Sequence, residues 1–530
     1  MRVDKKNAGL SLALASDADL CNDRILLRPA PFFLPPVSVG EIALNDDLEA
    51  EPSERSGADD AIESNPNASK RKMDAAILSG PFFPVIWKLS VPLVIGAILD
   101  NALSLVDMYF VGKLGTQAVA AVGIGGVWMG VIFMLIYGVS IACGSLVSIA
   151  VGNRDPERAG RIAGQSLMIA GVFSVIVALS VVPLTPWLLS LLASEKGISA
   201  EGVGYLNIMA GCVFTAYVPF ILFGILRGAG DTVSPMIAMM ISNVINVILD
   251  PLMIFGYGPI PAMGVDGSAW ATVIARVLGV GYLLVRMRGV RIPGIALTRR
   301  SFIPDADMIW RLATIGFFAS SQMLMRNIAA IAMMRFVRPF GPDAQAAYTI
   351  VVRLWFITLG IGINYGIAAS IMVGQNIGAN QMARAEKSAW LTAAYFSIAT
   401  VAASVFAYIF DEALVAIFQT EPEVVRIGSL MIQWLLWTLP FMGFSVVLTR
   451  ALNGAGDTRS ALIMTALPIL ILQIPLAYYL SNHWPFGSPQ NINGVFAAFS
   501  FTVVLQGLLM TFAFKAGRWK TIGARHRDAG

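Results

Sequence analysis

The sequence contains few charged residues. Asp, Glu, Lys and Arg make up 13% of its 530 residues, about half of the roughly 25% usual in soluble proteins. The net charge of +4 gives no strong field that would attract nucleic acid, so we expect no nucleic-acid partner. Hydrophobic residues reach 56% and the mean hydropathy is +0.71. This composition excludes a soluble, collagenous or coiled-coil protein and predicts a chain embedded in a lipid bilayer.

Cysteine and histidine are scarce as well. Cys21, Cys143 and Cys212 lie far apart, so they predict neither a disulfide framework nor a zinc cluster. His483 and His526 are the only histidines, and they leave little for histidine-based metal or acid–base chemistry. We therefore expect no resident cofactor and no enzymatic activity.

Long apolar runs fill the chain from residue 84 onward. A helix needs roughly 20 residues to cross the core of a bilayer, and twelve runs reach that length. They are 85–111, 118–151, 160–184, 203–227, 233–255, 266–287, 309–337, 344–376, 385–410, 424–451, 460–480 and 493–516. We predict an all-α integral membrane protein with twelve transmembrane helices.

The same pattern divides the chain into segments. Residues 1–79 are polar and interrupted by prolines, so we expect a disordered N-terminal tail. Six-helix bundles at 80–290 and 309–518 are joined by a linker at 291–308 and followed by a C-terminal tail at 519–530. Lys and Arg gather in the loops on the side of the N-terminus, which the positive-inside rule assigns to the cytoplasm. We expect a multi-pass protein of the inner or plasma membrane with the linker and both termini in the cytoplasm.

The two halves of the chain repeat one another. Residues 228–232 and 454–458 both read Gly-Ala-Gly-Asp-Thr, and Tyr137 recurs as Tyr365 at nearly the same offset. Each half holds six spans, so both halves begin on the same side of the membrane and the repeats are parallel. Transporters built from repeats bind substrate between them and rock one against the other. Neither glycine loop has the lysine of a phosphate-binding loop, so we expect secondary rather than nucleotide-driven transport.

Several motifs stand out along these runs: Pro92 and Val106-Asp107 in the first run, Asn246 and Asp250-Pro251 in the fifth, Gly267-Ser268-Ala269-Trp270 at the start of the sixth, and the two glycine loops. Together they resemble the motifs of the MATE (multidrug and toxic compound extrusion) family of cation-coupled exporters. The resemblance covers about residues 80–518. It implies two six-helix bundles around a V-shaped central cleft. It also implies export of small organic, often cationic, drugs or metabolites in exchange for H⁺ or Na⁺, and we expect a monomer.

Within this family, Asn246 and Asp250 are similar to the DinF-like branch, whose ion site lies in the N-terminal bundle. The resemblance assigns cation coupling to Asp107, Asn246, Asp250 and Thr272. If sodium is the coupling ion, the resemblance assigns the Na⁺ ligands to Asp107, Asn246 and Asp250. The other bacterial branch places carboxylates in the C-terminal bundle, where this sequence has Gln322.

The same residues are unusual on physical grounds. A carboxylate in hydrocarbon costs roughly 2.5–3.5 kcal/mol, so its presence needs a reason. Asp107, Asp250 and Thr272 are predicted at a similar depth below the outer surface, and Pro251 frees the carbonyl of residue 247. Oxygen ligands suit a hard cation, and carboxylates also take up protons. The alternative is that Asn246 and Asp250 only join helices through hydrogen bonds.

A second set of residues is predicted to face the substrate. The repeat offset aligns Asp100 with Arg326, and Arg353 lies at a similar depth, so we predict an acidic and a basic wall with Asp100 and Arg326 able to pair in one state. Aromatic faces attract organic cations. The aromatic candidates are Trp128, Tyr137, Trp355 and Tyr365. The alternatives are local pairing or snorkelling of the charges and simple packing of the rings.

These features favour a secondary efflux antiporter, and two other functions stay open. A lipid-linked precursor flippase of the related superfamily would have a strongly basic cleft. A polytopic membrane enzyme would need a cluster of His or carboxylate side chains near an interface, whereas the two histidines lie in the loop before the last run and in the C-terminal tail.

Overall fold

The computed structural model describes residues 76–192, 196–289, 294–483 and 491–529, all within one unit that spans residues 57–530. The disorder predicted for the N-terminal tail concerns residues 1–75, outside the described residues. Residues 76–79 are already helical, and buried Ile77 packs against α11 (Pro342–Gly378). Residues 76–79, which lie within the predicted tail, therefore belong to the described helical structure.

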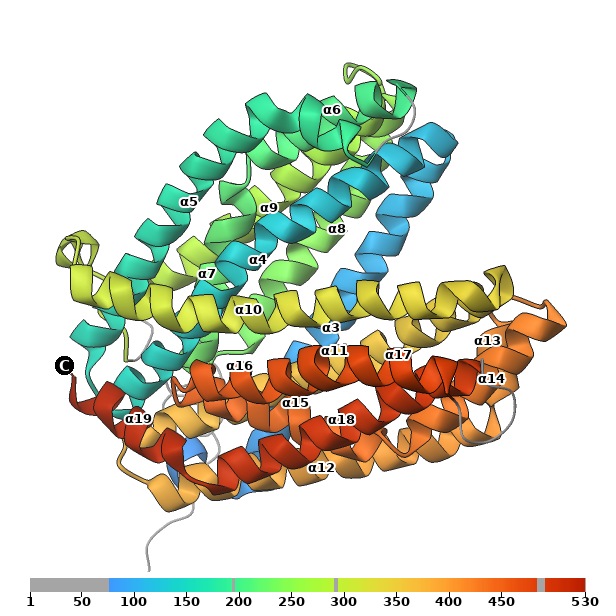
Figure 1. Ribbon diagram of the computed structural model, residues 1–530. Helices are drawn as coiled ribbons and strands as arrows, with labels where there is room; N and C mark the ends of the chain where they lie inside the picture. The colour runs from blue at the N-terminus through green and yellow to red at the C-terminus, as the bar shows by residue number, and fades with distance from the viewer. Residues whose placement is uncertain (1–75, 193–195, 290–293, 484–490, 530) are drawn as a thin grey trace, which may run out of the picture. The chain divides into compact units, whose positions relative to one another are not determined.

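Helices make up nearly all of the described chain (Figure 1). The first half contains α3 (Phe82–Gly112), α4 (Thr116–Gly152), α5 (Pro156–Ser190), α6 (Lys196–Gly211), α7 (Phe214–Gly228), α8 (Val233–Phe255) and α9 (Gly264–Gly289). The connection to the second half contains the short helix η1 (Arg299–Phe302). The second half contains α10 (Ala306–Val337), η2 (Arg338–Phe340), α11, α12 (Met382–Ile409), α13 (Asp411–Ala416), α14 (Pro422–Leu436), α15 (Leu439–Gly454), α16 (Thr458–Ala466), the π-helical η3 (Leu467–Gln473), α17 (Ile474–Asn482) and α18 (Ile492–Lys515), and α19 (Arg518–Asp528) follows.

Each predicted apolar run corresponds to one of these helices or to consecutive helices. Nine helices in the described ranges are long and apolar enough to cross a membrane, or up to eleven if each of two bent pairs counts as one span. The remaining run, 309–337, corresponds to α10, whose mean hydropathy is lowered by Arg311, Arg326 and Arg335. The prediction of an all-helical membrane protein is confirmed.

The bends were not predicted from the sequence. α6 and α7 meet at 44°, and α14 and α15 meet at 60°. Both breaks fall in the fourth span of their half, at positions separated by about the repeat offset. The second break is followed at once by Pro440, which cannot donate its nitrogen to the preceding turn. The shared position of the two bends is structural support for the internal repeat.

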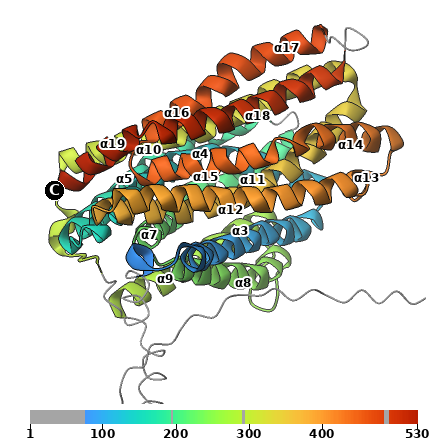
Figure 2. The same cartoon turned by 90° about the horizontal axis from the view of Figure 1, so that it is seen from below.

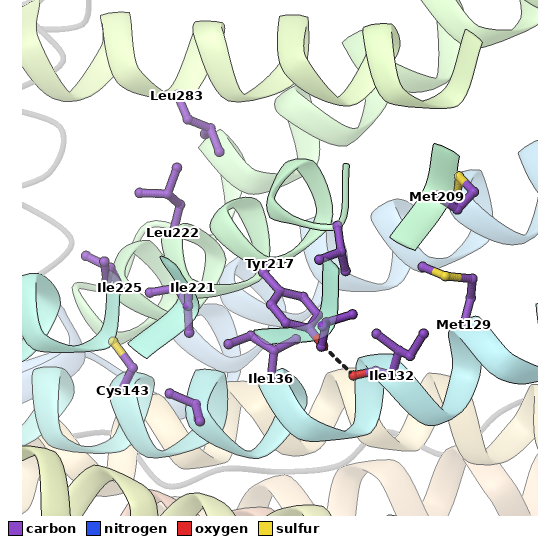
Figure 3. Close-up of a cluster of buried hydrophobic side chains, with 14 of the residues drawn as sticks. Met129, Ile132, Ile136, Cys143, Met209, Tyr217, Ile221, Leu222, Ile225 and Leu283 are labelled. Carbon is purple, nitrogen blue, oxygen red and sulfur yellow. Dashed lines mark hydrogen bonds between the residues drawn. The ribbon is translucent and has the colours of Figure 1, made fainter. Parts of the chain in front are cut away.

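Each half has its own apolar core. In the first half, side chains of α4, α6, α7 and α9 interlock around Tyr217, whose hydroxyl donates to the carbonyl of Ile132 (2.7 Å) (Figure 3). Outward-facing residues are also apolar: Leu179, Ile331 and Trp437 are 73%, 75% and 81% exposed. Helices that are apolar on all sides are typical of a bilayer environment.

The two halves touch along the part of the protein where α4 and α11 end and α19 lies, which we call the α19 end. Here α4 packs against α10, α11 and α15. A Cβ atom added to Gly138 would lie 2.0 Å from the carbonyl oxygen of Gly316, and one added to Gly152 would lie 2.0 Å from that of Gln375. Away from this end the ribbons of α3–α9 and α10–α18 diverge (Figure 1). Glycine therefore allows the two halves to approach each other closely at the α19 end.

Helix α19 lies across the junction of the halves. Arg158 of α5 donates to the carbonyls of Arg527 (2.7 Å) and His526. Arg311 of α10 donates to the carbonyl of Ala529 (3.1 Å). Because the free carbonyls at a helix C-terminus attract cations, these two arginines attach the end of α19 to both halves.

We predict that this attachment weakens at low pH. Burial and the positive charges of Arg311 and Arg158 lower the pKa of His526 from 6.5 to about 4. The attached α19 therefore favours a neutral imidazole. The contribution of His526 to the stability of this attachment is complete above pH 6.5 and is lost as the pH falls toward 4. Limited proteolysis of the C-terminus over this range measures the release. The His526→Gln variant should lack this step, and an equal step in that variant would contradict the assignment to His526.

Candidate functional site

Polar side chains from three helices meet in the first half, away from the α19 end; we call them the acidic cluster. Asn246 Nδ2 of α8 donates to Asp250 Oδ1 (3.3 Å) and to Thr272 Oγ1 of α9 (3.4 Å). Ser268 Oγ of α9 donates to Asp107 Oδ1 of α3 (2.8 Å). Asn246 is 2% exposed and Asp250 is fully buried. The four predicted coupling residues and Ser268 thus form two small hydrogen-bonded groups, whose carboxylates Asp107 and Asp250 interact with each other.

Simple helix geometry produces this arrangement. Residues 246 and 250 are one turn apart and share a face of α8, which packs against α3 and α9; α3 and α8 lie side by side in Figure 2. Helix α9 can approach α8 closely because residue 267 is a glycine. A Cβ atom added there would lie 2.4 Å from the carbonyl oxygen of Met253. Pro251 cannot donate to the carbonyl of Val247, which leaves one more oxygen without its helical donor a turn from the carboxylates.

The acidic cluster contains an incompletely satisfied acid. The carboxylates of Asp107 and Asp250 interact with each other, and Asp250 Oδ2 is buried without a hydrogen-bond donor. Two neighbouring carboxylates in a low-dielectric interior repel each other unless a proton or a cation lies between them. The geometry therefore fits reversible binding of a proton or a small cation.

Two residues of this region, Ser268 and Arg276, were not assigned to the site from the sequence. They follow the predicted Thr272 and one another at four-residue intervals on α9, so all three share one helix face. The guanidinium of Arg276 interacts with Asp107, Asp100 and Tyr205 of α6. The signal was present, because an arginine inside an apolar run at this spacing indicates a polar stripe.

A second polar group lies between the halves. Tyr137 and Arg326 line a cavity of about 150 Å³ bounded by α4, α10, α11 and α15. Arg450, also in its wall, donates to Tyr137 Oη. Asp100 instead interacts with Arg276 of its own half, and no ion pair joins Asp100 to Arg326. Pairing of Asp100 with Arg326 stays a prediction for another state.

Three of the other predicted substrate residues contact protein groups in this structure, and the fourth is exposed. Trp128 donates to the backbone of α5 (3.0 Å). Trp355 and Tyr365 each lie against a phenylalanine ring of the second half, at 5.4 and 5.3 Å between ring centroids. Arg353 is exposed on α11. None of the four lines the cavity of Tyr137 and Arg326, and their contact with substrate stays a prediction.

The oxygen atoms of the acidic cluster limit which ions it suits. No group of three or more His, Cys, Asp or Glu side chains among the described residues is placed to hold a metal ion. The acidic cluster offers two carboxylates with amide and hydroxyl oxygens, which are hard ligands. This set fits Na⁺ or proton exchange better than a tightly held transition metal.

Comparison with known proteins places this fold in a family. The MatE family model matches residues 92–252 and 319–479, once in each half and over more than half of the chain. The chain belongs to the MatE family. The resemblance to MATE exporters is therefore confirmed, and the two matches confirm the internal repeat. MatE proteins are transporters, so this chain is a membrane transporter and not an enzyme.

Individual relatives are similar to this MatE protein over most of its length. It is 27% identical over 451 residues to the probable multidrug resistance protein YoeA of Bacillus subtilis, covering 82% of this chain and 95% of that protein. It is 27% identical over 443 residues to the FAD transporter of Shewanella oneidensis, covering 82% and 94%. A crystal structure of MATE in the bent conformation shares the fold with a TM-score of 0.78 at 21% identity, covering 86% of this chain and 99% of that one.

Proposed function

We propose that this MatE protein is a secondary antiporter that exports small organic compounds while H⁺ or Na⁺ enters through the acidic cluster. The observation that carries the proposal is the buried, donor-free Asp250 Oδ2 beside Asp107. A carboxylate pair at membrane depth is costly, and a cation that binds and leaves gives it a function. The contacts of Asn246 and Asp250 within the first half support the DinF-like branch.

Coupling follows from charge neutralisation. Ion binding cancels the repulsion between Asp107 and Asp250 and allows α3, α8 and α9 to repack. When the ion leaves, Arg276 remains as a counter-charge for Asp107 and Asp100. Each positive charge that moves inward gains about 2.3 kcal/mol per 100 mV of membrane potential, which is enough to drive substrate outward.

The loop charges support one orientation. Arg154, Arg158, Arg384 and Arg518 lie at the α19 end, and the positive-inside rule then assigns this end to the cytoplasm. With the halves closed at the α19 end, the protein is outward-facing. A single chain contains both halves and the acidic cluster, so we take the monomer as the transporting unit.

Gradient-dependent dye efflux tests the proposal. Cells that express the protein are loaded with ethidium, and a pH gradient or a Na⁺ gradient is imposed separately. We expect one of the two gradients to accelerate efflux above that of cells without the protein, because only the coupling ion relieves the charge of the acidic cluster. Efflux that responds to neither gradient but to ATP depletion alone would contradict secondary antiport.

A further inference from the structure

Three arginines gather around one tyrosine between the two halves. Arg450 at the end of α15 donates to Tyr137 Oη, and its guanidinium carbon lies 5.6 Å from the centre of that ring. Arg227 at the end of α7 and Arg326 in the middle of α10 both interact with Arg450 and Tyr137. We call these four residues the arginine cluster; it draws on both halves of the protein.

Among the described residues, no acidic side chain forms an ion pair with this cluster. Arg450 is only 9% exposed. Arg227 Nε is buried without an acceptor. Burying a cation without a partner is costly, and removal of a partner from a buried pair leaves the same cost. The arrangement is therefore that of a site whose anion is supplied from outside the part of the chain that the structure describes.

Two cavities give an anion access to these groups. The cavity of about 150 Å³ exposes Arg326, and a second cavity of about 80 Å³, between α4, α7, α11 and α15, exposes Arg227. Tyr137 and Arg450 belong to both walls, and neither wall contains an acidic residue. The hydrogen-bonded Tyr137–Arg450 pair is thus common to both cavities.

The chemistry of the walls indicates what fits. Guanidinium groups bind carboxylate and phosphate oxygens through paired hydrogen bonds. In the larger cavity, Met323, Phe356 and Ile363 add an apolar surface suited to a ring or an alkyl group. We propose that the arginine cluster binds the phosphate or carboxylate group of an organic anion whose apolar part contacts this surface.

This inference rests on the proposed transport function and names a substrate class for it. An inside-negative membrane potential favours both the outward movement of an anion and the inward movement of the coupling cation. The acidic cluster then binds the coupling cation, and the arginine cluster binds the exported anion. Because the arginine cluster joins both halves, an anion there contacts both of them at once.

Binding of matched coumarins tests the inference. The purified protein, in nanodiscs of phosphatidylcholine alone so that no anionic lipid competes, is titrated with 4-methylumbelliferyl phosphate, 7-hydroxycoumarin-4-acetic acid and uncharged 4-methylumbelliferone. We expect at least one anionic probe to bind about tenfold or more tightly than the uncharged ring, as expected for hydrogen bonds to charged groups. Which anion binds more tightly distinguishes phosphate from carboxylate recognition.

Variants assign this preference to the arginine cluster. Arg326→Gln and Arg450→Gln should lose the preference for the anionic probe, and Arg326→Lys should retain part of it. The control is Arg335→Gln, because Arg335 is exposed on α10 and lies outside both cavities. This variant should leave the preference unchanged. Equal binding of all three probes by the unmodified protein, or an unchanged preference in both Gln variants, would overturn the inference. Efflux of ethidium and of the anionic coumarins by the unmodified protein separates the two proposals. Gradient-driven efflux without anion preference refutes only the anion site, whereas the absence of gradient-driven efflux of every one of these compounds refutes antiport itself.

Discussion

Cells that carry Asp250→Asn are expected to lose gradient-driven efflux entirely, to the level of cells without the protein. Asparagine has nearly the same shape and can accept the hydrogen bond from Asn246 Nδ2, but it neither takes up a proton nor balances the charge of a cation. Asp107→Asn is expected to have the same effect, since its carboxylate is the other half of the pair. The measurement is the initial rate of ethidium efflux under each ion gradient.

Two controls separate loss of coupling from loss of structure. Glu412→Gln removes an exposed carboxylate on α13 and should leave efflux unchanged. The purified Asp250→Asn protein should keep the preference of the unmodified protein for the anionic coumarins, because the acidic cluster lies apart from both cavities between the halves. Efflux in Asp250→Asn or in Asp107→Asn at the rate of the unmodified protein would show that the pair does not couple transport.

The helices could be predicted from the sequence because a lipid environment imposes one rule along the whole chain. Every span must be apolar and satisfy its own backbone hydrogen bonds, so the ends of runs such as 233–255 coincide with the observed helix α8. The bends after Gly211 and Leu436 have no such local rule. They depend on how the fourth span of each half packs against its neighbours, which a hydropathy profile does not record.

Only the parts of the candidate site that depend on local spacing could be predicted from the sequence. Asn246 and Asp250 lie one turn apart on a helix, so their proximity follows from the helix alone. The hydrogen bond from Ser268 to Asp107 joins residues far apart in the sequence. A single serine forms no sequence pattern from which this contact could be predicted. Arg227 and Arg450 were interpreted as loop charges on the inner side; their position in cavity walls depends on the contact between the halves, which no local pattern contains.

Closure of the α19 end depends on a contact that only glycine permits. A Cβ atom at Gly138 would lie 2.0 Å from the carbonyl oxygen of Gly316 and 2.3 Å from Ser320 Oγ. Ser320 itself crosses the junction, since its hydroxyl donates to the carbonyl of Met134 (2.6 Å). Real Cβ atoms do not approach backbone atoms this closely, so a larger side chain at 138 forces α4 and α10 apart.

We therefore expect Gly138→Leu to hold the protein open at the α19 end and to abolish efflux while the protein stays in the membrane. In a background without native cysteines, Ser148→Cys reports this opening, because Ser148 is 1% exposed at the contact of α4 with α11. A thiol reagent added from the α19 side should label it slowly in the parent and much faster with Gly138→Leu. Gly130→Leu, on the same helix with no atom within 4 Å, should change neither labelling nor efflux. Slow labelling together with normal efflux in Gly138→Leu would mean that transport does not require this closed contact.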